Sequence, residues 1–252
     1  MTTITFANQK GGVGKTTLAF NLAKGLAGRG HKILVIDNDP QGNLTSSFLD
    51  NPPSQLTANV LSLYDQEATP LTPQTVGEGL DLIGADISLS LVNERAFDVI
   101  FLLREGLQGI RENYDFILID CLPSFGYLKT AALNATDHVL IPIKPAPYAL
   151  QGLKDLLGTI GKVRERLNKQ LQVLGMVLNM VEGKPTRLAL EIEEVLRHQY
   201  PDFVFESVVN KAVKMEESPS FNQSIMEYEP RGKAAAQFGG FMDEFLSRLK
   251  KA

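Results

Sequence analysis

Short apolar runs alternate with longer segments of helical periodicity along most of this chain. An uninterrupted apolar run is typical of a strand buried on both faces, whereas apolar positions three and four apart mark one face of a helix. Strands are expected at residues 3–7, 32–37, 80–83, 116–120, 139–142, 171–178 and 203–209. Helices are expected at residues 18–26, 97–111, 148–167, 186–199 and 234–249. This alternation predicts an α/β fold: a mostly parallel twisted β-sheet with helices on both faces, in a single domain over residues 1–252.

One stretch departs from this rhythm. Residues 51–79 contain Pro52, Pro53, Pro70 and Pro73. Prolines at this density break regular elements, so the stretch is expected to be a surface loop with a short helix.

The last expected helix carries an apolar stripe. Its members repeat at helical spacing: Phe238, Phe241, Met242, Phe245, Leu246 and Leu249. Such a stripe, followed by Lys250 and Lys251, either docks on the sheet or lies on a membrane surface. Asp243 and Glu244 on the polar side would be repelled by anionic lipid, which favours docking on the sheet.

A glycine-rich stretch joins the first strand to the first helix. It reads Gln9-Lys10-Gly11-Gly12-Val13-Gly14-Lys15-Thr16-Thr17. Glycines let backbone N–H groups turn inward, and the helix that follows points its partly positive end at the same place. Lys15 supplies a charge for β- and γ-phosphates, and the Thr16 hydroxyl can ligate Mg²⁺. In the usual phosphate-loop pattern the first glycine falls on Gln9, and a dinucleotide pattern fails because its third glycine falls on Thr17.

Carboxylates follow two of the predicted strands. Asp37 and Asp39 lie at the end of the second strand, and Asp120 ends the apolar run 116–119. Ligands of open α/β sheets bind at the carboxyl ends of strands. Carboxylates beside a triphosphate repel it unless a metal or an attacking water is present, so these residues predict Mg²⁺ and hydrolysis. One of the pair Asp37 and Asp39 could instead cap the next helix.

Composition narrows the class of protein. The chain has 252 residues, 44% of them hydrophobic and 21% charged, which is typical of a globular protein. A formal charge of −4 argues against nucleic-acid binding by bulk charge but allows a local basic patch. The single cysteine, Cys121, rules out an intrachain disulfide and favours a reducing compartment. Neither a signal peptide nor an apolar run of about 18 residues is found, so no membrane span is expected.

Residues 8–17 resemble the deviant Walker A motif of the ParA/MinD family of ATPases, in which Lys10 is the signature lysine. Residues 37–41 and 116–120 match two further motifs of the family in the same order. The resemblance implies that Lys10 reaches across a dimer to the partner's nucleotide. It also implies that Asp39 orients the attacking water, and that Asp39, Asp120 and Thr16 serve Mg²⁺. Leu122 departs from the family's Asp-x-Pro-Pro pattern.

Two asparagines follow predicted strands. Asn179 has both a donor and an acceptor for an adenine edge, but it could equally be a turn residue. The resemblance favours adenine contact. Asn210 stands where the family usually has a proline next to the base, and it is placed in the base site on that ground. The expected nucleotide site therefore comprises Lys10, Gly11, Gly12, Val13, Gly14, Lys15, Thr16, Thr17, Asn179 and Asn210.

The family's function supplies the remaining expectations. A ParA-like ATPase binds ATP and Mg²⁺, forms a homodimer with ATP between the subunits, and binds DNA without sequence preference. Its weak hydrolysis is stimulated by a ParB-like or other adaptor protein, and it segregates a plasmid or chromosome or positions a cargo. Such a protein acts in the cytoplasm of a bacterium or archaeon, on the nucleoid. Because the first strand begins near Thr3, no N-terminal operator-binding domain is expected.

The candidate DNA contacts are four cations late in the chain: Lys211, Lys214, Arg231 and Lys233. Glutamates outnumber them between residues 203 and 233, so a monomer is expected to bind DNA weakly. A dimer would double the number of phosphates neutralised.

Three rival functions share the phosphate loop. A MinD-like positioning ATPase would use the final helix on a membrane. A redox protein like the nitrogenase iron protein would need two cysteines per subunit, and this chain has one. A P-loop metabolic enzyme would need a substrate pocket with its own acid, base or anion-binding residues, for which the sequence offers no candidate set.

Overall fold

The computed structural model describes residues 1–65 and 71–251, so Pro70 lies outside the described residues. The strands form one sheet of eight in the order β3-β4-β2-β5-β1-β6-β7-β8. Their bounds are β1 Thr2–Phe6, β2 Ile33–Asn38, β3 Gln74–Gly77, β4 Leu80–Ile83, β5 Phe116–Cys121, β6 His138–Ile143, β7 Gln172–Val181 and β8 Val204–Asn210. Every paired strand is parallel to its neighbour except β3, which is antiparallel to β4 at one edge. The predicted mostly parallel sheet is confirmed.

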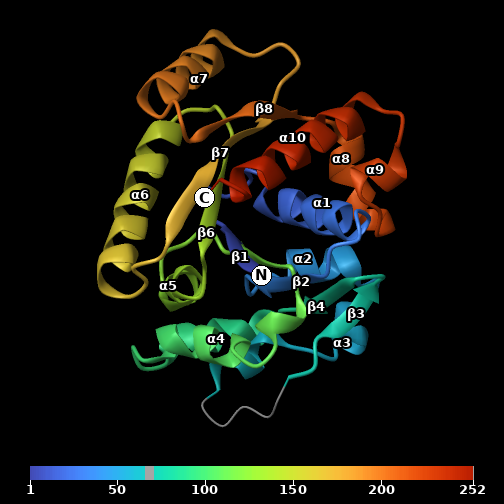
Figure 1. Cartoon of the computed structure of the whole chain (residues 1–252), viewed down its shortest axis with the longest axis vertical. Helices are drawn as coiled ribbons and strands as arrows, with labels where there is room; N and C mark the ends of the chain where they lie inside the picture. Colours follow the sequence, from blue (N-terminus) through green and yellow to red (C-terminus); the bar gives the residue numbers. More distant parts are fainter. Residues whose placement is uncertain (66–70, 252) are drawn as a thin grey trace.

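Helices cover both faces of this sheet (Figure 1). The α-helices are α1 Lys15–Ala27, α2 Asn43–Phe48, α3 Pro52–Gln55, α4 Val99–Leu107, α5 Tyr127–Asn134, α6 Ala149–Arg166, α7 Arg187–Gln199, α8 Val213–Glu217, α9 Ile225–Tyr228 and α10 Lys233–Leu249. The 3₁₀ helices are η1 Val60–Tyr64, η2 Ile87–Glu94, η3 Arg111–Asn113 and η4 Ser218–Phe221.

Alternation along each strand divides the core between the two faces. On β2, Ile33 and Val35 pack in the same cluster as α1 and α10, whereas Leu34 and Ile36 pack with α4 and α5. On the other side of β1, where β6, β7 and β8 lie, helices α6 and α7 pack on the sheet. Burial on both faces favours apolar side chains at every position, as in residues 33–36 of β2 and 116–119 of β5, whereas β1 also buries Thr3 and Thr5.

The apolar stripe of α10 is docked on the sheet. Phe238, Phe241 and Phe245 are 0% exposed, and Phe241 packs against Phe205 of β8 with ring centroids 5.4 Å apart. The sequence allowed this stripe either to dock on the sheet or to lie on a membrane surface, and the structure shows it docked on the sheet. None of the described helices is long and apolar enough to span a bilayer.

Three expectations need correction. The stretch 51–79 is not only a surface loop with a helix, because it contains strand β3 and the buried side chains of η1. The helix expected at 97–111 covers only Val99–Leu107, and Gly109, which weakens helices, lies just beyond its end. The strand expected to end at residue 178 continues to Val181, so Asn179 lies inside β7 and does not follow it.

Candidate functional site

The glycine-rich stretch forms a loop at the carboxyl end of β1, in the middle of the sheet between β5 and β6. Gly12 and Gly14 adopt φ values of 67° and 79°, and Gly14 is the N-cap residue just before α1. These angles favour glycine over any residue with a Cβ. The loop therefore turns its backbone toward the N-terminus of α1, as the sequence predicts for a phosphate-binding loop.

Asn179 holds this loop from the neighbouring half of the sheet. Its Nδ2 donates a hydrogen bond of 2.8 Å to the carbonyl of Val13. A Cβ added at Gly14 would lie 2.5 Å from the same Nδ2 atom, so only glycine allows this approach. The contact of Asn179 with adenine, which the family resemblance favours, stays a prediction, and the structure adds a contact of Asn179 with the loop itself.

Lys15 occupies the first turn of α1 and is 7% exposed. Burial lowers its pKa, whereas the charge of Asp120 and, less strongly, that of Asp39 act in the opposite direction. A largely buried ammonium group next to carboxylates is suited to bind an incoming anion, because its charge is poorly screened by water.

Asp37 and Asp120 lie side by side because β2 and β5 are paired at these residues. Asp37 is fully buried and accepts two hydrogen bonds of 2.8 Å, from the backbone N and the Oγ1 of Thr45 in α2. Burial raises the pKa of Asp37 to about 6, although the bonds from Thr45 act against it. Asp37 is therefore the aspartate that anchors the next helix.

Asp120 ends β5 beside the loop. Its Oδ2 accepts a hydrogen bond of 2.6 Å from the hydroxyl of Thr16, and its buried Oδ1 has no hydrogen-bond partner among the described residues. Burial, followed by the charge of Asp37, raises the pKa of Asp120 to about 7. A buried carboxylate oxygen without a partner, next to a hydroxyl, matches the donor set that Mg²⁺ prefers.

The described residues do not include three His, Cys, Asp or Glu side chains grouped to hold a metal unaided. Mg²⁺ is commonly held by one or two carboxylates together with substrate phosphates. The residues present thus fit a Mg²⁺ ion that arrives with a phosphorylated ligand.

Asp39 lies just beyond β2 and is partly exposed. Its Oδ1 accepts a hydrogen bond of 3.0 Å from the backbone N of Gln41, which leaves Oδ2 for another partner. The charge of Asp39 acts on both Lys15 and Asp120, so the three side chains share one site. Its expected contact with water or metal stays a prediction.

Lys10 lies apart from this cluster, on the surface. Its Nζ donates a hydrogen bond of 3.1 Å to the carbonyl of Pro147, just before α6. Its backbone N donates to Asn8 Oδ1 at 2.9 Å, and Asn8 in turn donates to the carbonyl of Pro142. The structure therefore separates the two lysines of the motif, one buried and one exposed.

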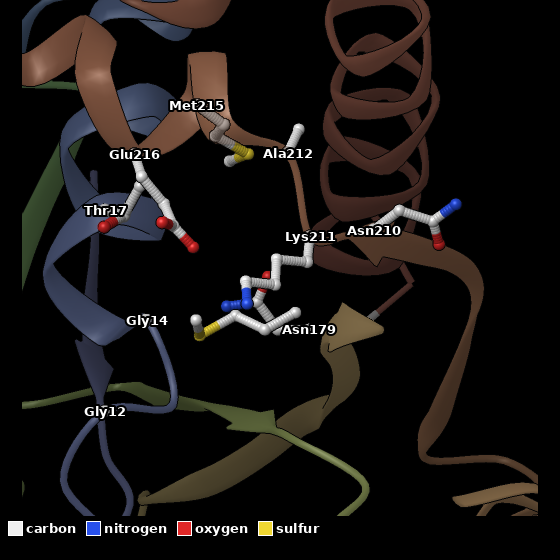
Figure 2. A pocket seen from close by; sticks show the side chains of 10 residues that line it. Gly12, Gly14, Thr17, Asn179, Asn210, Lys211, Ala212, Met215 and Glu216 are labelled. Atoms are coloured by element: carbon white, nitrogen blue, oxygen red, sulfur yellow. The ribbon is translucent and has the colours of Figure 1, made fainter. Parts of the chain in front are cut away.

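A pocket of about 190 Å³ opens beside the loop (Figure 2). Its lining residues are Gly12, Gly14, Thr17, Asn179, Met180, Asn210, Lys211, Ala212, Met215 and Glu216. Asn210 lies at the rim, and its side chain points away from the other side chains in Figure 2. The expected contact of Asn210 with a base stays a prediction.

Lys129 is a charged residue of this region that the sequence reasoning missed. It is 1% exposed, donates a hydrogen bond of 2.8 Å to the carbonyl of Pro123, and lies 5.2 Å from the centre of the Phe125 ring. Burial lowers its pKa to about 8, and the charge of Lys15 acts in the same direction. Its burial could have been suspected from the sequence, because a single lysine lies between Leu128 and the apolar run 131–133. The sequence analysis did not predict the helix that contains it, α5.

The four candidate DNA contacts do not form an uncompensated patch. Lys211 lies 3.4 Å from Glu182, and Lys214 pairs with Glu229. Arg231 and Lys233 are exposed and have no ion-pair partner among the described residues. Their role in DNA binding stays a prediction.

Cys121 lies at the end of β5, 1% exposed, as a free thiol. Burial raises its pKa to about 12, so the thiol is protonated at neutral pH and is a poor nucleophile.

Comparisons with known proteins agree with this geometry. The profile of a family described as an AAA domain matches residues 1–173. The sporulation initiation inhibitor protein Soj of Bacillus subtilis is 36% identical over 236 residues, which cover 92% of this chain and 93% of Soj.

Two solved structures share the fold over almost the whole chain. A putative plasmid partition protein from Borrelia burgdorferi bound to AMPPNP has a TM-score of 0.82 and 26% identity, covering 98% of both chains. Cobyrinic acid a,c-diamide synthase from Mycobacterium smegmatis, with bound ADP and magnesium, has a TM-score of 0.81 and 26% identity, covering 99% of this chain and 96% of that one.

Proposed function

The chain belongs to the ParA/MinD family of P-loop ATPases, and we propose that it is a partition or positioning ATPase in which residues 1–252 act as one domain. The observation that carries the proposal is the meeting of Lys15, Thr16 and Asp120 at the loop after β1. This trio unites a buried cation, a hydroxyl and a carboxylate oxygen that has no partner in the described part of the chain, which are the groups that a nucleotide and its Mg²⁺ require.

Nucleotide binding follows from the loop. The backbone N–H groups of residues 11–17 would surround the β- and γ-phosphates, and Lys15 would neutralise their charge. Thr16 and Asp120 would hold Mg²⁺, which when bound polarises the phosphoryl oxygens and spreads the charge of the transition state. The base would enter the pocket between Asn179 and Ala212.

Hydrolysis needs a positioned water. Asp39 accepts a hydrogen bond from the backbone N of Gln41 at Oδ1, and its Oδ2 has no hydrogen-bond partner within residues 1–65 and 71–251, so this oxygen would orient a water in line with the γ-phosphorus. The water oxygen forms the new P–O bond, the bond to the β-phosphate oxygen breaks, and ADP and phosphate leave with the released proton going to solvent. A single carboxylate in cis is consistent with weak intrinsic turnover that a partner protein stimulates.

Dimerisation would recruit Lys10. Its side chain is exposed, its Nζ contacts only the Pro147 carbonyl among the described residues, and one exposed hydrogen bond is worth about 1 kcal/mol or less. Lys10 can therefore leave Pro147 at little cost and reach the nucleotide of a second subunit. Two subunits would bring two sets of Lys211, Lys214, Arg231 and Lys233 together, and avidity would then favour non-specific DNA.

We place such a protein in the bacterial cytoplasm on the nucleoid, where it would segregate a plasmid or chromosome, or position a cargo, with an adaptor protein of the ParB type. The Soj relative and the Borrelia plasmid partition protein support this assignment.

The proposal is tested by following dimerisation and DNA binding together. Sedimentation of the wild type should show a dimer with Mg²⁺ and ATP and a monomer with ADP, and duplex DNA of any sequence should bind only the ATP form. Lys10→Ala should bind ATP as a monomer and fail in both later steps. A Lys10→Ala protein that dimerises normally would remove the trans role of this lysine.

One alternative has support of its own. The likeness to cobyrinic acid a,c-diamide synthase admits an ATP-dependent enzyme that acts on a small molecule. DNA-stimulated ATP turnover, tested with and without an adaptor, separates the two: turnover that is indifferent to DNA but rises with a carboxylic acid substrate would favour the enzyme.

A further inference from the structure

The pocket beside the loop contains one carboxylate. Glu216 lies near the end of α8, and its side chain points into the pocket on the same side as Thr17 (Figure 2). Met180, Ala212 and Met215 give the same pocket an apolar wall. Glu216 is exposed, so water solvates its carboxylate in the empty pocket, and a ligand that donates a hydrogen bond would replace that water.

Glu216 has no such donor within the described parts of the chain. None of the recorded side-chain hydrogen bonds or ion pairs involves its carboxylate, although nearby Lys211 and Lys214 pair with Glu182 and Glu229. The two lysines that could have neutralised Glu216 are thus engaged elsewhere. Its charge is available to a ligand.

The covalent order of a nucleotide decides what Glu216 would meet. The phosphates belong at the N-terminus of α1, and Thr17 stands in its first turn. The sugar is bonded directly to the α-phosphate, so it follows the phosphates out of the loop before the base does. Phosphate oxygens accept hydrogen bonds and repel a carboxylate, whereas the sugar hydroxyls donate them.

We propose that Glu216 is a specificity residue that accepts a hydrogen bond from a hydroxyl of the ribose and so selects ribonucleotides over 2′-deoxyribonucleotides. This inference rests on the proposed nucleotide site, and it adds that the site distinguishes the sugar of the nucleotide. Carboxylates that bind the ribose 2′-hydroxyl serve the same purpose in dinucleotide-binding folds.

The charge of Glu216 has a second effect, which a test must separate from the first. A carboxylate near the phosphates weakens the binding of every nucleotide by repulsion, whichever sugar it carries. Removing the charge therefore shifts the affinities for ribo- and deoxyribonucleotides together. Only their ratio reports the hydrogen bond to the hydroxyl.

The experiment compares ADP with 2′-deoxy-ADP by calorimetry on the full-length protein in Mg²⁺. Diphosphates are chosen because they are not hydrolysed and should leave the protein monomeric. A hydrogen bond to a charged acceptor is worth about 1.5 kcal/mol at its lower limit, so the wild type should prefer ADP by about tenfold. Glu216→Ala should bring the ratio of dissociation constants close to one, and Glu216→Gln should give an intermediate ratio.

Glu217→Ala is the matched control, because it removes the same charge from the adjacent exposed residue, which does not line the pocket. It should keep the wild-type ratio. Melting of each variant without nucleotide verifies that the exposed substitutions leave the fold intact.

The outcomes are distinct. A wild-type protein that binds both nucleotides equally, or a Glu216→Ala protein that keeps the full preference for ADP, overturns the inference and leaves the nucleotide site in place. A change in the preference for adenine over guanine, with the sugar preference intact, also overturns it. A wild-type protein that binds neither diphosphate would overturn the proposed function itself.

Discussion

Asp120→Asn should stabilise the nucleotide-free protein and weaken its response to Mg²⁺ and ATP. Asp120 is 2% exposed, and burial is the main reason that its pKa rises from 3.8 to about 7. A carboxyl group whose pKa is raised by folding favours the folded state while it is protonated. Its contribution is complete below pH 3.8 and is lost as the pH rises through about 7, so at pH 8 the ionised side chain opposes folding.

The magnitude follows from the two pKa values. A difference of about 3 in pKa corresponds to about 4 kcal/mol at pH 8, and less than half of that remains at pH 5. Asparagine keeps an acceptor for Thr16 and puts its amide where Oδ1 already has no partner among the described residues. Hydrogen bonding therefore changes little, and the loss of the buried charge dominates. For a chain of this length the melting temperature should rise on the order of 10 °C at pH 8.

The assay is thermal unfolding in EDTA at pH 8 and pH 5, repeated at pH 8 with Mg²⁺ and ADP. Asp50→Asn, a change at an exposed carboxylate, is the control and should melt within a degree or so of the wild type at both pH values. With Mg²⁺ and ADP the wild type should gain stability by mass action, and Asp120→Asn should gain clearly less.

Two results would refute the reasoning. One is an Asp120→Asn protein that is no more stable than the wild type at pH 8 without nucleotide. The other is a stabilisation of equal size at pH 5 and pH 8, because that could not come from the ionisation of a carboxyl with a raised pKa.

Three further substitutions test the other parts of the site. Lys15→Ala should weaken ATP binding at least a hundredfold in calorimetry, because the phosphates lose their buried countercharge, and unchanged affinity would exclude this role. Asp39→Ala should still bind ATP but lose more than 90% of phosphate release, with wild-type turnover as the contrary result. Lys129→Met should speed amide hydrogen exchange over residues 122–126 but not in α10, since the Pro123 carbonyl loses its donor; equal exchange in that segment would show that the bond does not hold it.

The sequence was most informative where the structure is determined locally. Residues 33–36 of β2 and 116–119 of β5 are apolar at every position because both faces of these strands are covered, so such a run identifies a strand by itself. The loop and its lysine were also recognisable, because glycine, lysine and hydroxyl act within a few consecutive residues.

Other features depend on partners far away in the chain. Strand β3 has an exposed alternating pattern and is defined by its pairing with β4. The burial of Lys129 depends on the Pro123 carbonyl and the Phe125 ring, neither of which a helical pattern reveals. The glutamates that pair with Lys211 and Lys214 lie 29 and 15 residues away, so the charge balance of that surface required the fold.

The hydrogen bond from Asn179 to the Val13 carbonyl determines the orientation of the Asn179 side-chain amide. With one N–H of Nδ2 committed to the Val13 carbonyl, the side chain keeps its second N–H and its oxygen for other partners. The same bond that holds the loop in shape therefore also sets the orientation in which Asn179 presents these two groups to the pocket.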